Sequence, residues 1–286
     1  MPDSFAIEPD PSGDVLVVAG GWTAEISAVL ASGRVRGLVL NYARGFRERD
    51  LEMLRPWPIE RLDVLARTLT DLTPIYRLAG TLRELSVTSS PRAALDCARL
   101  PNLTSLIASD WPQISATVAR AQRLTHLGTG GYDEIDLRPL DGLTGLTSLR
   151  IKQAPGLAAL GAAPGTLTSL EIFAAPGLQD IEEVGRLTAL RHLWFRGCGG
   201  ITALDDLATS TGLTELAVAN CGPIASAGPL GGLTGLTRLN LSESTRITDG
   251  DLRPLLGLHH LQDLRMMNRR HYVPPLAAVK AALGIT

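Results

Sequence analysis

A single pattern of apolar and polar positions recurs along most of the chain. It reads Leu-x-x-Leu-x-apolar, and its second leucine returns about every 22 residues from Leu38 to Leu264. Within each copy apolar and polar residues alternate, which predicts a short strand with one buried face. One copy alone cannot bury that face, so the regular period predicts strands stacked in parallel, each covered by the next. The eleven copies begin at Val35, Ile59, Leu82, Leu103, Leu124, Leu146, Leu167, Leu190, Leu213, Leu236 and Leu261.

A second apolar anchor follows the strand at the twelfth position of most copies. It is filled by Phe46, Ile114, Ile135, Leu157, Leu178, Ile201, Ile224 and Ile247. The second copy has Thr70 there instead, so we expect the copies before residue 124 to be less regular than the later ones. At the ninth position, Cys198, Cys221 and Ser244 occupy three successive copies.

These features resemble the leucine-rich repeat family, and the resemblance covers residues 35–268. The turns at Cys198 and Ser244 are similar to its cysteine-containing subtype. The resemblance implies an α/β leucine-rich repeat solenoid, bent into a horseshoe. Its parallel concave sheet would have about 11 strands, with short helices or turns on the convex side.

The two ends of such a solenoid need caps, because they would otherwise expose the core. Residues 1–34 are expected to form an amino-terminal cap, a strand followed by a short amphipathic helix that carries Trp22. Residues 35–268 form the repeats. Residues 269–286 are expected to form a carboxyl-terminal cap helix that starts at Pro274 and Pro275.

Composition narrows the class of protein. The chain is 45% hydrophobic and 20% charged, as folded globular proteins are. Its net charge of −2 argues against nucleic acid and anionic membranes as partners. The acidic amino terminus lacks the basic and apolar segments of a secretory signal, and the Gly-, Ala- and Arg-rich composition favours a bacterial source, so we expect a cytoplasmic bacterial protein. Cys97, Cys198 and Cys221 are expected to be reduced, although a disulfide between the last two stays open.

The repeat register assigns a direction to each strand residue. Phe195 points into the core, whereas Trp194 points out of the concave sheet. Trp, Phe and Arg are the residue types that anchor protein interfaces, so the outward cluster predicts a site for a protein or peptide partner. An alternative is that the cluster satisfies itself, with Glu171 paired to Arg150 or Arg196 and an arginine stacked on Trp194. The predicted contact residues are Arg150, Lys152, Glu171, Phe173, His192, Trp194, Arg196, Arg238, Arg265 and Met267. Gly128, Gly130 and Gly131 predict a trough of bare backbone beside them.

No pattern in the chain indicates catalysis, a cofactor or a metal. His192 and Cys198 point in different directions in the repeat frame, the glycine run at 128 lacks the Lys-Ser/Thr of a phosphate loop, and the histidines have no metal-ligand spacing. We therefore expect a non-enzymatic scaffold that binds a protein or peptide on its concave face. The alternatives are a subunit that selects substrates for a separate enzyme, a structural protein that forms homo-oligomers, or an immunity protein that neutralises a toxin.

Overall fold

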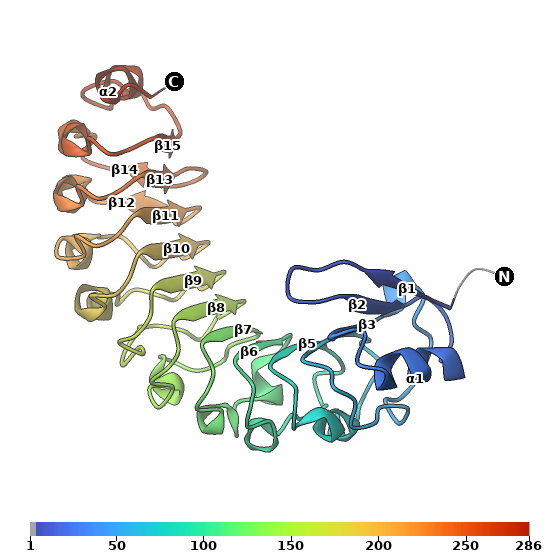
Figure 1. The fold of residues 1–286 in the computed structure, drawn as a ribbon. Helices are drawn as coiled ribbons and strands as arrows, with labels where there is room; N and C mark the ends of the chain where they lie inside the picture. The colour runs from blue at the N-terminus through green and yellow to red at the C-terminus, as the bar shows by residue number, and fades with distance from the viewer. Residues whose placement is uncertain (1–3, 286) are drawn as a thin grey trace. The chain divides into compact units, whose positions relative to one another are not determined.

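The computed structural model describes residues 4–285, which fall into two compact units that divide between Gly130 and Gly131. In each unit, strands lie side by side in chain order, and a returning segment links each strand to the next (Figure 1). The sequence did not predict this division. The cap boundaries at residues 34 and 269 stay predictions.

The strands of the first unit carry the early copies of the repeat. Their leucines stand in register, so Leu38 pairs with Leu62 and Leu62 with Leu85. The sheet is parallel except at its start, where β1 runs antiparallel to β2. The strands are β1 (Phe5–Glu8), β2 (Val15–Val18), β3 (Gly37–Asn41), β4 (Arg61–Leu65), β5 (Glu84–Thr88), β6 (Ser105–Ala108) and β7 (His126–Gly130).

The amino-terminal helix begins two residues after Trp22. Helix α1 (Ala24–Ala31) is capped by Thr23, whose side chain accepts a hydrogen bond from the Ile26 amide. Trp22 therefore precedes the helix, which corrects the sequence prediction. Its ring stacks on Trp57, with centroids 5.8 Å apart. Strand β1 was not predicted, because it lies outside the repeat and forms only by pairing with β2.

The second unit contains the most regular copies. The second leucines Leu149, Leu170, Leu193 and Leu216 pair in register across four neighbouring strands. Six strands of this unit carry the repeat pattern, and β3–β7 of the first unit carry it as well. Together they are the eleven repeat strands that the sequence predicts, all of them within residues 4–285. The six strands of the second unit are β8 (Ser148–Lys152), β9 (Ser169–Phe173), β10 (His192–Arg196), β11 (Glu215–Ala219), β13 (Arg238–Leu241) and β15 (Asp263–Met266).

The returning segments are short 3₁₀ helices and turns, as predicted, and many of them contain Pro or Gly, which limits the length of a helix. Two segments also pair as two-residue strands, β12 (Pro223–Ile224) and β14 (Arg246–Ile247), and helix α2 (Leu276–Leu283) follows β15. The 3₁₀ helices are η1 (Tyr42–Arg44), η2 (Thr73–Leu78), η3 (Cys97–Arg99), η4 (Trp111–Gln113), η5 (Val118–Arg120), η6 (Arg138–Leu140), η7 (Glu182–Arg186), η8 (Asp205–Leu207), η9 (Gly228–Gly232) and η10 (Arg253–Gly257).

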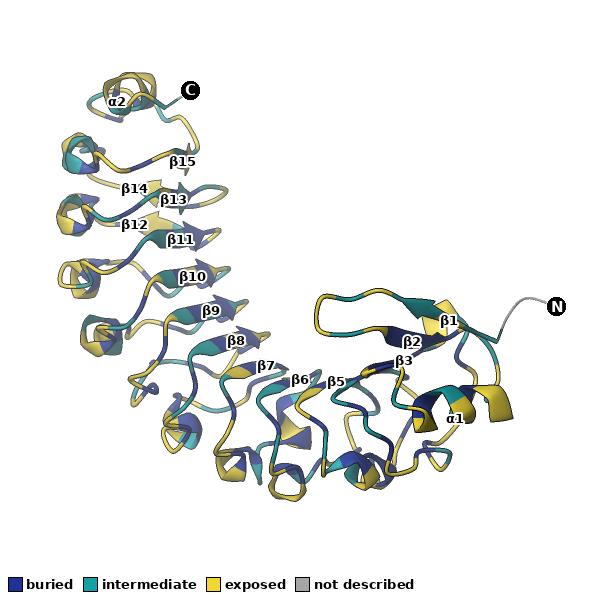
Figure 2. Ribbon diagram, in the orientation of Figure 1, coloured by how far each residue is buried: buried dark blue, intermediate teal, exposed yellow. Residues whose placement is uncertain are grey.

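The core of each unit lies between the sheet and the returning segments, where the buried residues of most repeat strands follow one face (Figure 2). The anchors predicted at the twelfth position are buried, with one exception. Ile135 is 68% exposed, so that prediction is wrong. Tyr132 and Leu137 fill the interior there instead, and the Tyr132 hydroxyl donates to the Asp136 carbonyl at 2.7 Å.

A ladder of backbone hydrogen bonds follows the strands of the second unit. In the copies that begin at Leu146, Leu167, Leu190, Leu213 and Leu236, the eighth residue adopts a left-handed conformation, with φ between 52° at Asn220 and 70° at Gly197. Its amide donates to the neighbouring copy, for example from Ala174 to the Arg196 carbonyl at 2.8 Å. At the ninth position, Cys198 and Cys221 are buried, but Ser244 is exposed. Thr245 takes its place, because its hydroxyl accepts from the Cys221 amide at 3.0 Å.

We expect Ala174→Gly to stabilise the protein by about 0.5–1 kcal/mol. Ala174 has φ 55°, a conformation that is unfavourable for a residue with a Cβ, and Gly197 already occupies the equivalent position of the next copy. The gain is reduced because glycine also makes the unfolded chain more flexible. Urea denaturation of the variant and the parent measures the difference. A lower midpoint for the variant would show that the ladder does not carry this strain.

Candidate binding surface

The register of the second unit separates the two aromatic neighbours on β10. Leu193 and Phe195 are fully buried, whereas Trp194 is 38% exposed. Trp194 pairs with Glu171 on β9 and with Ala217 on β11. The predicted register is therefore confirmed: Phe195 belongs to the core and Trp194 to the outer side of the sheet. We call the outer side of strands β8–β11, β13 and β15 the open face.

Parallel pairing aligns the outward residues of the open face into rows across the strands. One row runs from Arg150 through Trp194 to Arg265, and a second from Lys152 to Ala219. Residues far apart in the sequence thus become neighbours. The first row consists of Arg150, Glu171, Trp194, Ala217, Asn240 and Arg265, and the second of Lys152, Phe173, Arg196 and Ala219.

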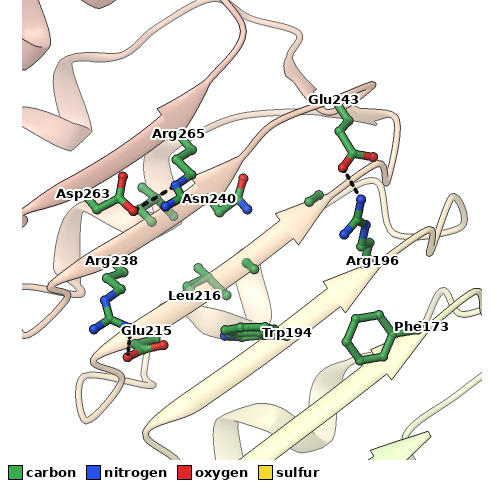
Figure 3. Close-up of a pocket in the computed structure, with 13 residues that line it drawn as sticks. Phe173, Trp194, Arg196, Glu215, Leu216, Arg238, Asn240, Glu243, Asp263 and Arg265 are labelled. Atoms are coloured by element: carbon green, nitrogen blue, oxygen red, sulfur yellow. Dashed lines mark hydrogen bonds and ion pairs between the residues drawn. The ribbon is translucent and has the colours of Figure 1, made fainter. Parts of the chain in front are cut away.

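A hollow of about 210 Å³ opens in this face above β11. It forms because Ala217 and Ala219 present only methyl groups, while Trp194 and Arg196 stand on one side and Arg265 on the other (Figure 3). We call this the β11 hollow. It is lined by Phe173, Trp194, Arg196, Glu215, Leu216, Ala217, Ala219, Arg238, Leu239, Asn240, Glu243, Asp263 and Arg265.

Each arginine of the hollow is paired with a carboxylate (Figure 3). The nitrogen–oxygen distances are 2.6 Å for Arg196–Glu243, 2.8 Å for Arg238–Glu215 and 2.9 Å for Arg265–Asp263. Glu215 also lies 3.7 Å from the His192 ring nitrogen Nδ1. The charges around the hollow are therefore neutralised locally, and the apolar surface of Trp194 and Phe173 remains between them.

The self-satisfied alternative is found in part. Arg150 donates two hydrogen bonds to Glu171, at 2.7 and 2.9 Å, and these bonds raise the pKa of its guanidinium above the ordinary value. Arg196 pairs with Glu243 rather than with Glu171. The cation–π contact found among residues 4–285 lies elsewhere, between Arg99 and Tyr76 in the first unit. Pairing thus neutralises the four arginines of the open face, while Trp194 stays partly exposed.

Half of the residues predicted as contacts line the hollow: Phe173, Trp194, Arg196, Arg238 and Arg265. The others lie outside it: Arg150, Glu171 and His192 on the neighbouring part of β8–β10, and Lys152 and Met267 exposed beyond the hollow. The sequence interpretation missed Glu215, Ala217, Ala219, Asn240, Glu243 and Asp263 as members of the site. Two alanines in adjacent outward positions, flanked by large residues, are the signal that would have found it.

The trough predicted at Gly128, Gly130 and Gly131 is not where the hollow lies. The glycines fall at the boundary between the two units, and within the first unit Ile107 lies against Gly128. A Cβ added to Gly128 would contact the Ile107 side chain at 3.4 Å, and Ile107 itself is 54% exposed. A large neighbouring side chain therefore occupies the space that the glycine leaves.

The groups that the sequence analysis considered for chemistry do not come together within residues 4–285. Among residues 4–285 no group of three or more His, Cys, Asp or Glu side chains could hold a metal ion. Cys198 is buried, and its pKa is raised by its hydrogen bond with Cys221 and by burial, while His192 lies on the open face. All three cysteines are free thiols. No helix in the described part of the chain is long and apolar enough to cross a membrane.

Comparison with known proteins gives matches in structure. Neither the protein-family models nor the curated proteins match this chain. An internalin (InlF) from Listeria monocytogenes is 27% identical over 85% of this chain and 71% of its own, with a TM-score of 0.62. The functional domain of InlJ from the same species, which includes a cysteine ladder, is 22% identical over 80% of this chain and 48% of its own, with a TM-score of 0.59.

A third similar structure comes from another bacterium. The leucine-rich repeat protein of Leptospira interrogans is 14% identical over 86% of this chain and 64% of its own, with a TM-score of 0.56. The repeat strands in register within each unit, the buried anchors at all but one of the predicted positions and these bacterial neighbours agree on the fold. The chain therefore has a leucine-rich repeat fold, which is similar to the folds of these bacterial proteins.

Proposed function

We propose that the protein is a non-enzymatic scaffold whose open face in the second unit binds a protein or peptide partner. The observation that carries the proposal is the β11 hollow, which presents Trp194 and Phe173 beside paired charges. Aromatic residues and arginines contribute most of the binding energy at protein interfaces, and paired charges around them form a polar rim. Short strands packed on a buried leucine core hold these side chains in fixed positions, which limits the entropy lost on binding.

Each class of partner that the sequence analysis leaves open would bind to this same face. A toxin, the substrate of a separate enzyme or a second copy of this chain would each bury Trp194. Size-exclusion chromatography separates the last class from the others, because self-association through the hollow gives a dimer that Trp194→Ala converts to a monomer.

Filling the hollow should abolish partner binding without unfolding the protein. We expect Ala217→Leu to reduce binding at least about tenfold, because the larger side chain occupies the space that the partner needs. Ala217 is an outward residue of β11, so its replacement adds no atoms to the core. The measurement is the amount of partner that each immobilised variant retains from a lysate of the source organism, quantified by mass spectrometry.

Ser169→Leu is the matched control. Ser169 is also a small outward residue, on β9, and does not line the hollow. The control should retain the partner as well as the parent does, and both variants should keep the parent's melting temperature. Equal retention by Ala217→Leu and the parent would contradict the proposal that this face binds the partner.

A further inference from the structure

We propose that the β11 hollow is an anchor pocket for one large uncharged side chain, aromatic by preference, on an extended segment of the partner. This inference rests on the proposed function and specifies the chemistry that the site recognises. It follows from three properties of the hollow: its size, the nature of its floor and the pairing of the charges around it.

The size of the hollow fits one side chain rather than a free small molecule. Its volume of about 210 Å³ lies below the roughly 300–1,000 Å³ of typical small-molecule pockets. Its depth is the height of the neighbouring side chains above two methyl groups, because Arg196 and Trp194 flank Ala219 and Ala217 in register. If a segment of the partner lies across the open face, one of its side chains can enter the β11 hollow.

The floor of the hollow is apolar. Ala217 and Ala219 line it together with Trp194, Leu216 and Leu239. Trp194 is the large aromatic residue exposed on this face, and a second aromatic ring placed beside it gains stacking or edge-to-face contact beyond the burial of its area. The floor therefore favours an aromatic occupant over a polar one.

The charges around the floor disfavour a charged occupant. Three arginines face three carboxylates, and each forms a pair at 2.6–2.9 Å. A lysine or a glutamate entering the hollow would lose its water and find each opposite charge already occupied. An uncharged side chain leaves the three pairs intact, and they then surround it as a polar rim that excludes water.

A phage-displayed library of random linear peptides, selected on the whole protein, tests the anchor directly. We expect the enriched peptides to share one aromatic position. Replacing that residue by Ala or by Arg should weaken binding more than about tenfold. Ala217→Leu should weaken the same peptides to a similar extent, and Ser169→Leu should leave them unchanged. Because the anchor is uncharged, the affinity should change less than about threefold between 0.05 and 0.5 M salt.

The outcomes separate failure of the anchor from failure of the proposed function. Peptides that share a basic or acidic residue and lose binding to Ala217→Leu would overturn the anchor chemistry, while the open face would stand as the binding surface. Peptides that bind the parent and Ala217→Leu equally would overturn the hollow as their site. A selection without enrichment would also count against the anchor, and partner retention from lysate would then judge the proposed function separately.

Discussion

Leu193→Ala is expected to lower the free energy of unfolding by about 2–5 kcal/mol. The Leu193 side chain is fully buried and stands in register between Leu170 and Leu216, so its truncation leaves a cavity in the row of leucines that joins three copies. Urea denaturation followed by circular dichroism measures the loss. A decrease below about 0.5 kcal/mol would mean that the row is not the core.

The neighbouring outward residue provides the control for this prediction. Trp194→Ala removes a larger side chain, yet the ring lies on the outer side of the sheet and is 38% exposed, so we expect a stability change below about 1 kcal/mol. Equal destabilisation by both variants would show that the inward and outward directions have been assigned wrongly.

The second large effect concerns binding. Trp194→Ala should weaken binding of the partner, or of a peptide selected on the hollow, by about 2 kcal/mol or more, because tryptophan is one of the residue types enriched at interface hot spots. Isothermal titration calorimetry with the parent and the variant measures the difference. Lys152→Ala is the matched control, since Lys152 is exposed on the same face but does not line the hollow. Similar losses for both residues would point to diffuse attraction rather than an anchor.

The repeat strands could be predicted because the spacing of the leucines determines both the direction of each side chain and the order of the strands. Alternation fixes the inward direction of Leu193 and Phe195, and the constant period fixes which strands become neighbours. The prediction of an anchor at Ile135 was wrong because it counts residues and ignores their volume. The buried ring of Tyr132 fills the turn, so the chain reaches the interior again only at Leu137.

The candidate site was predicted only in part, because a hollow depends on the positions of small side chains as much as on those of large ones. The search for large and charged residues found Trp194 but passed over Ala217 and Ala219. The partner of Arg196 was also missed. It is Glu243, which is 47 residues away and follows strand β13 rather than lying in it. Side-chain pairing of this kind depends on rotamers and loop positions, which the repeat period does not determine.

The central claim is that the open face of the second unit binds the partner. Site-specific photo-crosslinking tests this claim most directly. A photoreactive residue at Asn240 would lie in the lining of the hollow, and one at Ala208 would lie exposed after η8, on the side of the returning segments. We expect a crosslink to the partner from position 240 and none from position 208. A crosslink from position 208 alone would contradict it.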